Sequence, residues 1–521
     1  MQRREWTIAI ALSVGVAGAT LVPYLAAERL AGGEAVFAGF LINPIDAFSY
    51  LAKMRQGADG SWLFHLPYAP APGDGALLFS YYLMLGHLAQ ALGAPLLTVF
   101  HAARLTGSLT MYLAAFWLYT RILPDPRARW SAFGLTLVGS GLGWAAVPMG
   151  RMAADLWIPE LIPSFSAYAS AHFSLAAAAY LVGLLSLLPG SKLVLRVSLA
   201  ALSGLVLSVL QPFSVLGLLA VAAGWLGWEA LQAGRREWKM GGPPPAGSLG
   251  PLFALVLGAA PQLAYDAWVF RTEPAFASWA AQNQTPSPPP LDYLLGLGVI
   301  GVLALVGIAK GRAHHSAHGR LLIAWTLVQG LLLYAPVGVQ RRLALGWFFP
   351  LAALAGTGLA TWLGSSRKCL IGLALAFALS LPSNLLLVGA GLSAVARGEP
   401  ALVLSRGELE AYEWLADHTR GSPLVLAAPD TGNRLPAFAD VRVLYGHPFE
   451  TPDAEQQRRL VESLFRSTQS AAKDLQRLGE LGVDLVFYGP REQALGRPSW
   501  LDGLTVLHRT EGVVVYEVPR P

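Results

Sequence analysis

Long apolar stretches alternate with short polar stretches over the first 396 residues of the chain. A helix needs about 20 mostly apolar residues to cross a bilayer, and uninterrupted apolar runs of that length favour such helices. The pattern therefore predicts a polytopic α-helical membrane protein with about eleven transmembrane helices. The predicted apolar segments are 6–27, 95–120, 131–149, 171–189, 197–211, 213–231, 249–270, 291–309, 320–337, 343–363 and 369–391.

The pattern changes after residue 396, where short apolar runs alternate with amphipathic stretches. Strands that alternate with helices are typical of an α/β layer structure. We therefore expect a transmembrane domain at 1–396 and a small C-terminal α/β domain at 397–521. The predicted strands are 423–428, 441–445, 483–488, 504–508 and 513–518, and the predicted helices are 408–417, 454–465 and 471–481.

Composition supports a membrane protein, since 54% of the residues are hydrophobic and only 13% are charged. A soluble protein carries about 25% charged residues. The net charge of +5 does not indicate a nucleic-acid partner, because the basic residues lie in loops between apolar segments rather than along an aromatic-rich stripe.

The distribution of charge predicts the orientation of the chain. If the N-terminus is cytoplasmic and the segments alternate, every inside segment is basic and most loop acids lie outside. The sequence therefore predicts a multi-pass protein of the plasma or inner cell membrane, with a cytoplasmic N-terminus and an extracytoplasmic C-terminal domain. The inside basic residues are Arg3, Arg4, Arg121, Arg127, Arg129, Lys192, Arg196, Arg235, Arg236, Lys239, Lys310, Arg312, Arg320, Arg367 and Lys368, and the outside acids are Glu28, Glu34, Asp46, Asp59, Asp74, Asp155, Glu160 and Glu273.

Two stretches between the predicted spans need a separate interpretation. Residues 75–92 are apolar but contain Tyr81, Tyr82, His87 and Gln90. If this segment crossed the membrane, every later basic loop would lie outside, so we expect it to lie on or dip into the outer face. Residues 232–250 contain the glycines and prolines of 241–245 and predict an irregular inside linker.

The first outer loop, residues 28–75, is long, whereas most other loops are short. Asp46, Tyr50 and Lys53 share one face of a predicted helix, because they are spaced by four and then three residues. Asp46 follows Asn43-Pro44, so it is either a functional carboxylate or the N-cap of that helix. Further along, Trp62, His65 and Tyr68 are aromatic residues with polar tips, which suit an interface.

Two short motifs give the chain a resemblance to a known family. They are Asp46-x-x-x-Tyr50-x-x-x-Met54-Arg55-Gln56 and Gly446-His447-Pro448-Phe449-Glu450-Thr451. Together with one helix before a long outer loop, many further helices and an outward C-terminal domain, they resemble the GT-C glycosyltransferases. The resemblance implies an inverting hexosyl- or pentosyltransferase that moves a sugar from a polyprenyl-phosphate-linked donor to an extracytoplasmic lipid, glycan or protein acceptor.

The resemblance also implies roles for individual residues. Asp46 becomes the catalytic base, or a metal ligand where there is a metal, and a divalent cation stays open as a cofactor. Asp155 or Glu160 in the second outer loop supplies a second catalytic acid, unless both are ordinary solvated loop residues. The residues assigned to substrate binding are Tyr50, Lys53, Arg55, His65, His172, Arg341 and Arg342, although a histidine placed like His172 is more often a packing residue.

Arg341 and Arg342 lie at the outer end of a predicted span, against the orientation rule. An arginine guanidinium binds phosphate with two parallel hydrogen bonds, so a lipid phosphate would explain this exception. Pairing with lipid headgroups or with outer-loop acids is the alternative.

Other assignments stay open from the sequence. Asp430, His447, Glu450 and Asp453 follow predicted strands and either contact the acceptor or are turn residues. A transporter or flippase for a lipid-linked glycan is the alternative function, and an assembly protein is a third. The chain has no phosphate-binding Gly-x-x-x-x-Gly-Lys-Ser/Thr loop, which disfavours ATP-driven transport.

Overall fold

The computed structural model describes residues 3–33, 35–240, 246–311 and 313–519. Glu34, Arg312 and residues 241–245 of the expected linker lie outside the described residues. The start of that linker was wrong, because the helix that begins at Pro212 continues to Met240. The side chains of Arg235, Arg236 and Lys239 are likewise not described.

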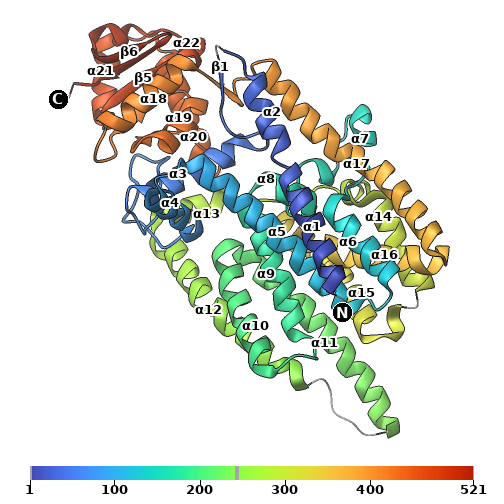
Figure 1. Cartoon of the computed structure of the whole chain (residues 1–521). Helices are drawn as coiled ribbons and strands as arrows, with labels where there is room; N and C mark the ends of the chain where they lie inside the picture. The colour runs from blue at the N-terminus through green and yellow to red at the C-terminus, as the bar shows by residue number, and fades with distance from the viewer. Residues whose placement is uncertain (1–2, 34, 241–245, 312, 520–521) are drawn as a thin grey trace. The chain divides into compact units, whose positions relative to one another are not determined.

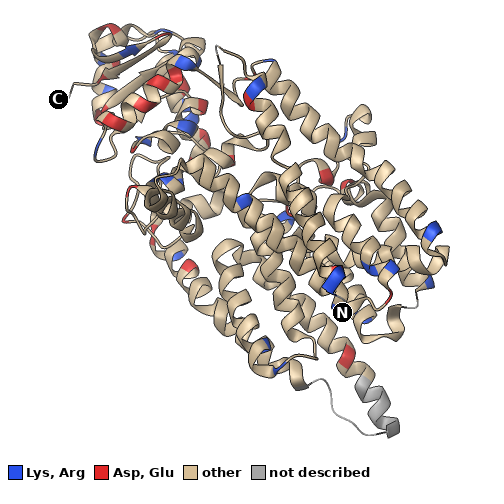
Figure 2. Ribbon diagram, viewed as in Figure 1, with Lys and Arg blue, Asp and Glu red and all other residues tan. Residues whose placement is uncertain are grey.

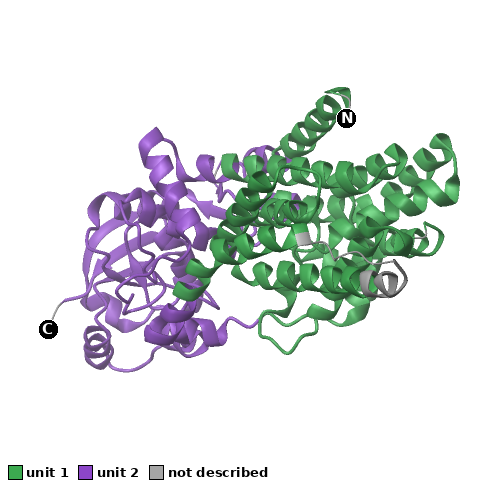
Figure 3. Ribbon diagram, turned by 90° about the horizontal axis from the view of Figure 1, so that it is seen from below, with its two compact units in different colours: residues 1–22, 102–265, 285–390 green, residues 23–101, 266–284, 391–521 purple. Residues whose placement is uncertain are grey.

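The chain folds into two compact units, which Figure 3 shows in different colours. Unit 1 contains residues 1–22, 102–265 and 285–390, and unit 2 contains 23–101, 266–284 and 391–521. Packing therefore places the long first loop with the C-terminal residues. The division at residue 396 was drawn from hydropathy, and it stays a prediction about which part spans the membrane.

Helices dominate the chain up to residue 396 (Figure 1). Each of the eleven predicted apolar segments overlaps a helix, as their composition requires. Besides α2, which belongs mainly to the first loop, the helices that overlap these segments are α1 (Arg3–Ala19), α5 (Leu96–Ile122), α6 (Pro126–Val138), α7 (Gly143–Ala146), α9 (Ala171–Leu187), α10 (Leu193–Leu210), α11 (Pro212–Met240), α12 (Leu249–Thr272), α14 (Pro290–Lys310), α15 (Ala317–Leu332), α16 (Phe348–Leu363) and α17 (Ser366–Ala396).

The count of about eleven transmembrane helices is not confirmed. Among the described residues, seven helical segments are long and apolar enough to cross a membrane, or up to nine if each of two bent helix pairs forms one span. α9 and α15 fall short at 17 and 16 residues, below the roughly 20 that a bilayer requires. These helices support a multi-pass membrane protein.

Small residues let the helices of unit 1 pack backbone to backbone. A Cβ atom at Gly307 of α14 would lie 1.9 Å from the Leu354 carbonyl oxygen of α16. A Cβ atom at Gly356 of α16 would lie 2.3 Å from the Ala128 carbonyl oxygen of α6. Such close approach is how helices associate where the surroundings are as apolar as their side chains.

Short elements connect the helices of unit 1. They include α8 (Pro163–Ala169) and the 3-10 helices η1 (Val147–Met149), η2 (Ala154–Leu156), η3 (Ala246–Ser248), η4 (Ala313–His315) and η5 (Gln340–Ala344). The second outer loop thus carries Asp155 on η2, and Arg341 and Arg342 lie on η5.

The first loop in unit 2 contains α2 (Val22–Leu30), β1 (Ala35–Phe37), α3 (Pro44–Ala58) and α4 (Ser80–Leu92). β1 pairs antiparallel with β2 (Val403–Ser405), so this loop shares a small sheet with the C-terminal residues. α4 is followed by α5 after a bend of 120°. This bend directly follows the segment 75–92, which we expected to lie on or dip into the outer face.

The C-terminal residues of unit 2 form a five-stranded sheet in the order β4-β3-β5-β7-β6. β3 pairs in parallel with β4 and β5, whereas β7 pairs antiparallel with β5 and β6. The expected α/β fold is present here. The strands are β3 (Leu424–Leu426), β4 (Arg442–Val443), β5 (Leu485–Tyr488), β6 (Thr505–Thr510) and β7 (Val513–Glu517).

Helices accompany this sheet, and charged side chains are much denser here than along the long apolar helices (Figure 2). The core beneath them includes Leu426, Val486 and Trp500, each fully buried. The helices are α18 (Arg406–His418), α19 (Pro429–Phe438), α20 (Ala454–Phe465), α21 (Ala471–Glu480) and α22 (Pro490–Leu495), with η6 (Ser499–Gly503) between the last strands; α13 (Pro274–Gln282) also belongs to unit 2.

Candidate active site

Asp46 lies in the first turn of α3, which begins with Pro44. Proline suits this position because its missing N–H would have no partner there and its φ already matches a helix. The N-cap is Asn43 rather than Asp46, and the Asn43 amide donates a hydrogen bond to Asp46 Oδ2. Asp46 is therefore not the N-cap, and the helix N-terminus favours its ionised form.

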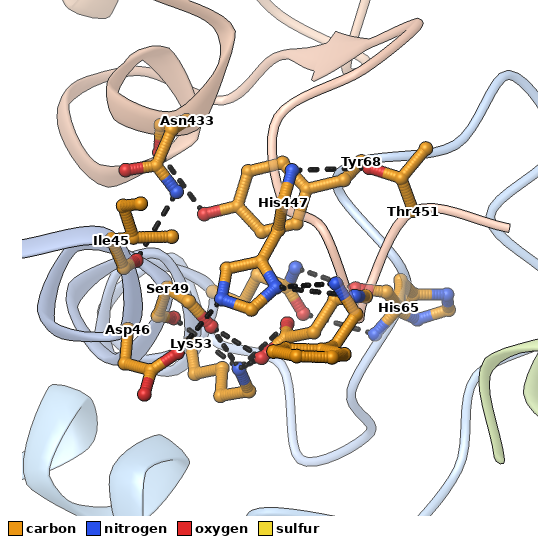
Figure 4. Close-up of polar contacts among 12 residues, drawn as sticks. Ile45, Asp46, Ser49, Lys53, His65, Tyr68, Asn433, His447 and Thr451 are labelled. Carbon is orange, nitrogen blue, oxygen red and sulfur yellow. Dashed lines mark hydrogen bonds and ion pairs between the residues drawn. The ribbon is translucent and has the colours of Figure 1, made fainter. Parts of the chain in front are cut away.

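His447 holds the other carboxylate oxygen of Asp46 (Figure 4). The distance from His447 Nε2 to Asp46 Oδ1 is 2.9 Å, and the side chains are 3% and 39% exposed, respectively. His447 Nδ1 accepts hydrogen bonds from the backbone N–H groups of Phe449 (3.1 Å) and Glu450 (3.2 Å). Because Nδ1 accepts, the proton of a neutral imidazole lies on Nε2, and His447 donates to Asp46.

One to two turns further along α3, a buried ion pair joins the same helix to the same loop. Lys53 Nζ lies 2.8 and 2.9 Å from the two carboxylate oxygens of Glu450, and it also donates to Ser49. The Ser49 hydroxyl donates to Glu450 Oε1 at 2.6 Å. The ring of Phe79 lies 4.2 Å from Lys53 Nζ, so an aromatic face also contacts this ammonium.

The charge of Glu450 is set by these partners. Its burial alone would raise the pKa, but the charge of Lys53 and the hydrogen bonds from Lys53 and Ser49 hold the pKa of Glu450 below its ordinary value of 4.5. Glu450 is therefore an anion, and Lys53 is the cation that neutralises it. Burial pulls the pKa of Lys53 below its ordinary value, and Glu450 opposes that effect.

The loop 446–451 that carries His447 and Glu450 is itself tightly held. Thr451 Oγ1 accepts from the backbone N–H groups of Gly446 (3.2 Å) and His447 (3.1 Å). Gln282 of α13 donates to the carbonyl oxygens of Phe449 (3.1 Å) and Thr451. Side chains from two other segments therefore satisfy the polar backbone groups of this loop.

Tyr68 packs against the start of this loop and explains the glycine there. A Cβ atom at Gly446 would lie 2.3 Å from Tyr68 Cδ1, so a larger residue does not fit. The Tyr68 hydroxyl donates to the Asn433 carbonyl at 3.0 Å, and the Asn433 amide donates to the Ile45 carbonyl at 3.1 Å (Figure 4). α19 and α3 are thereby joined beside Asp46.

The other first-loop residues that the sequence assigned to substrate binding have partners of their own. Tyr50 stacks on Tyr82 with ring centroids 4.5 Å apart. Arg55 donates to the Phe438 carbonyl, and His65 exchanges two hydrogen bonds with Gln56 through its backbone (2.8 and 3.0 Å). All of these side chains stay partly exposed, whereas Lys53 is fully buried. Their role in substrate binding stays a prediction.

In unit 1, Asp155 is fully buried on η2. One carboxylate oxygen, Oδ2, accepts from the backbone N–H groups of Gly141 (3.0 Å) and Gly143 (3.1 Å). Burial raises the pKa of Asp155, and these hydrogen bonds together with one from Ser383 oppose the effect. Asp155 therefore fixes the backbone between α6 and α7, a structural role that the sequence did not indicate.

The second candidate acid, Glu160, has different surroundings. Glu160 is 7% exposed, and both it and Arg341 lie within electrostatic reach of the Tyr293 hydroxyl. The guanidinium carbon of Arg341 is 4.9 Å from the centre of the Trp157 ring, which comes from the same loop as Glu160. Unit 1 thus brings Glu160 close to Arg341.

The remaining candidates of unit 1 are Arg342 and His172, and both contact aromatic rings. Arg342 covers the ring of Phe213, the second residue of α11, with its guanidinium carbon 5.2 Å from the ring centre. His172 is 8% exposed in the first turn of α9 and its ring lies 4.0 Å from that of Phe173. Such burial suits a packing role, and a role in binding stays a prediction.

A divalent cation was left open by the sequence. Within the described ranges, no three His, Cys, Asp or Glu side chains gather closely enough to hold a metal ion. Asp46 and His447 form only a pair, and the hydrogen bond between them occupies both.

The sequence did not find the partners of Asp46 and Lys53. His447 and Glu450 belong to the motif that carries the family resemblance, but the sequence did not predict their contacts with α3, and it gave no role to Asn433 or Ser49. The motif Gly446–Thr451 was the available signal, because four of its residues each make a distinct contact: Gly446 with Tyr68, His447 with Asp46, Glu450 with Lys53, and Thr451 with the loop backbone.

Comparison with known proteins finds similar structures but no similar sequence family. No family model matches the sequence, and no curated protein matches it. The oligosaccharyltransferase of Archaeoglobus fulgidus with a tethered acceptor peptide has 13% identity and a TM-score of 0.53 over 99% of this chain and 74% of that one. ArnT from Cupriavidus metallidurans bound to undecaprenyl phosphate has 13% identity and a TM-score of 0.52, covering 99% of both chains.

The arabinofuranosyltransferase AftD from Mycobacteria has 15% identity and a TM-score of 0.51 over the whole of this chain, which spans 40% of AftD. These three proteins are GT-C glycosyltransferases. At such low identity the likeness shows a shared architecture, so the fold of this chain is that of the GT-C glycosyltransferases.

Proposed function

We propose that the protein is a membrane glycosyltransferase that takes its sugar from a polyprenyl-phosphate-linked donor. The acceptor is a lipid, a glycan or a protein on the extracytoplasmic side, and the transfer of the hexose or pentose inverts the anomeric carbon. The observation that carries the proposal is the partly exposed, hydrogen-bonded carboxylate of Asp46 on the first loop of a GT-C fold.

Asp46 suits the role of general base. Inverting transfer needs a carboxylate that accepts the proton of the attacking hydroxyl as the new glycosidic bond forms. His447 and Asn43 each donate to one oxygen of Asp46, so both oxygens are oriented, while 39% of the side chain stays open to a reactant. Both donors also favour the ionised form that a base requires.

Cations must stabilise the departing lipid phosphate, and Arg341 is the candidate that we favour. Its guanidinium stacks on Trp157, which orients the plane of the group, and its Nε is buried without a hydrogen-bond partner. A phosphate oxygen would satisfy that donor. Arg342 adds a second positive charge on the same short helix.

The donor class is supported by what the neighbours bind. ArnT is bound to undecaprenyl phosphate, and an Archaeoglobus fulgidus oligosaccharyltransferase is in complex with a dolichol-phosphate, at a TM-score of 0.50 and 12% identity. Both ligands are polyprenyl phosphates. The basic inside segments place both outer loops and residues 397–521 outside in this proposal, with the N-terminus in the cytoplasm.

The test is sugar transfer by the purified full-length chain in lipid nanodiscs. The donors are farnesyl-phosphate-linked mannose and arabinofuranose with labelled sugars, and loss of donor is measured with water or a membrane extract as acceptor. We expect consumption of a donor by the wild type, and a fall of about 10²–10⁴-fold in kcat for Asp46→Asn, the usual contribution of a general base.

Asp59→Asn is the matched control, because Asp59 ends the same helix, is also partly exposed and contacts Arg55 at 3.8 Å. We expect this variant to keep wild-type activity. Equal rates for Asp46→Asn and wild type would reject the assignment of the base, and an inactive wild type with every donor would reject the proposed function.

A further inference from the structure

His447 is a buried histidine on a loop 401 residues away from the carboxylate that it contacts. We propose that His447 is a positioning residue: it keeps a neutral imidazole with the proton on Nε2 and thereby fixes the orientation and charge of Asp46. This inference rests on the proposed role of Asp46 as the base. Loop 446–451 would then supply part of the reaction machinery.

The first step of the argument is the tautomer. Two backbone N–H groups, those of Phe449 and Glu450, point at Nδ1 of His447. A protonated Nδ1 would put three donors against one another, so the loop geometry excludes an imidazolium and leaves a single proton on Nε2. That proton lies between the imidazole and Asp46 Oδ1, which are 2.9 Å apart.

The second step is to decide which of the two side chains, Asp46 or His447, can act as the base. A neutral imidazole that already donates to Asp46 has no free nitrogen to accept a proton, so His447 is not itself a base. Exposure agrees, because 39% of the Asp46 side chain but only 3% of the His447 side chain is open to a reactant. The order is the reverse of a Ser-His-Asp triad, where the carboxylate orients the imidazole.

The third step concerns how firmly His447 is held. Thr451 Oγ1 binds the backbone at Gly446 and His447, and the ring of Tyr68 lies nearly parallel to the imidazole at 6.0 Å. Three residues on from His447, Glu450 joins the same loop to Lys53 of α3. Both the loop and the helix are fixed by this second attachment, so the hydrogen bond to Asp46 has little freedom to shift.

The fourth step is electrostatic. Glu450 would otherwise add a second negative charge beside Asp46, which would disfavour an ionised base. Lys53 neutralises Glu450 at 2.8 Å, and His447 is neutral, so Asp46 is left as the net charge of this group of four side chains. An uncharged donor at Asp46 is compatible with a base, because it does not compete for the proton that the base must take.

The alternative is that His447 serves only to hold the loop together. The two functions use different nitrogens, so two substitutions separate them. In His447→Asn the amide oxygen can still accept from Phe449 and Glu450, but no donor reaches Asp46. In His447→Gln the amide nitrogen reaches the former position of Nε2 and donates to Asp46, while the acceptor for the loop is lost.

The experiment measures kcat and KM for the nanodisc-embedded chain with the farnesyl-phosphate-linked sugar that the wild type consumes, together with the thermal midpoint. For His447→Asn we expect kcat to fall about tenfold to a hundredfold, as expected when a reacting group is misplaced by about 1 Å, with KM and the midpoint near wild type. For His447→Gln we expect most of kcat to be kept and the midpoint to fall. The opposite order, with Gln inactive and Asn active, overturns the proposal.

A spectroscopic measurement keeps the inference separate from the proposed function. The full chain is labelled with ¹⁵N-histidine and studied by NMR, and the histidine signal that disappears in His447→Asn is assigned to His447. We expect the ring proton of His447 to lie on Nε2 in the absence of substrate. Asp46→Ala should make that proton exchange faster with water. A proton on Nδ1, or exchange unaffected by Asp46→Ala, overturns the positioning role, whereas an inactive wild type with this tautomer intact overturns only the proposed function.

Discussion

Glu450 in unit 2 and Asp155 in unit 1 are both carboxylates enclosed by protein, and their surroundings act on their charge in opposite directions. Glu450 has a cation, Lys53, at 2.8 Å, and its pKa is held below the ordinary value. Asp155 has neutral donors, the backbone N–H groups of Gly141 and Gly143 among them, and its pKa is raised by burial. The charge of the partner, and not burial alone, therefore decides whether the pKa of an enclosed acid is raised or lowered.

The enclosed acids Glu450 and Asp155 also differ from Asp46 in their access to a reactant. Neither enclosed carboxylate is accessible to a reactant, because Glu450 is 7% and Asp155 0% exposed. Asp46 is the acid of this set with an exposed surface, and Asn43 and His447 each hydrogen-bond to one of its oxygens. Access to a reactant therefore separates the acid that we propose as the base from the two enclosed acids.

The largest expected effect tests the ion pair. Lys53→Met removes the cation and leaves the Glu450 carboxylate buried without a counter-charge, which should cost about 3–5 kcal/mol of unfolding free energy. The double variant Lys53→Met with Glu450→Gln should recover much of that loss, since no charge is left behind. Unfolding of the full chain in detergent, followed by tryptophan fluorescence, gives both values; equal losses for the two variants would show that Glu450 is not charged.

The second effect tests Asp155 with the matched pair of substitutions Asp155→Ala and Asp155→Asn. Alanine leaves two buried backbone N–H groups without an acceptor, at roughly 1–3 kcal/mol each. Asparagine keeps an acceptor oxygen and is neutral, so we expect it to cost clearly less in the same unfolding assay. If asparagine were as damaging as alanine, the negative charge of Asp155 would be essential and the contrast with Glu450 would fail.

The third effect is the pH dependence of the two sites, which should have opposite signs. The lowered pKa of Glu450 contributes stability that is fully present above its unfolded value of 4.5 and is lost as the pH falls through the lower folded pKa. The raised pKa of Asp155 stabilises the fold at low pH, and this contribution is lost as the pH rises above its unfolded value of 3.8 and through the folded pKa.

Thermal midpoints measured across this acid range check the sign. On acidification, Glu450→Gln should lose less stability than the wild type loses. For Asp155→Asn, the deficit in stability relative to the wild type should be larger at acid pH than at neutral pH. A parallel shift of both variants at every pH would contradict the opposite directions of the two pKa shifts.

The smallest effect concerns a surface pair in the same unit as Glu450. Arg458 lies 3.0 Å from Glu462 one turn along α20, and its side chain is 54% exposed. Exposed pairs of this kind contribute about 0.3–0.5 kcal/mol, and salt screens them. Arg458→Ala should therefore change the midpoint only slightly and less at high salt; a loss as large as that of Lys53→Met would refute the role that we give to burial.

Local patterns were enough to predict most elements of the fold. The helix 454–465 was predicted with the bounds that α20 has, because its apolar residues recur at helical spacing between charged ones. α19 was missed, since Pro429, Gly432, Asn433 and Pro436 are typical of turns, and tertiary contacts such as that of Asn433 with α3 override this local preference.

Only the part of the site that lies on one helix was predicted from the spacing of residues along the chain. The common face of Asp46 and Lys53 follows from helical periodicity, and loop 446–451 does contact both of them. No periodicity relates a residue to a partner some 400 positions away, so the contacts of His447 and Glu450 could not be derived. For the same reason the burial of Lys53 was not apparent: its neighbours Phe64 and Phe79 come from a different part of the loop.

The separation of Lys53 and Glu450 along the chain has a consequence for biosynthesis. A ribosome that adds about 5–20 residues per second needs roughly 20–80 s to make the 397 positions between them. Throughout that interval the Lys53 ammonium has no Glu450 to neutralise it, so it must remain hydrated or be covered by another factor. The first outer loop can adopt its final packing only when nearly the whole polypeptide has left the translocation machinery.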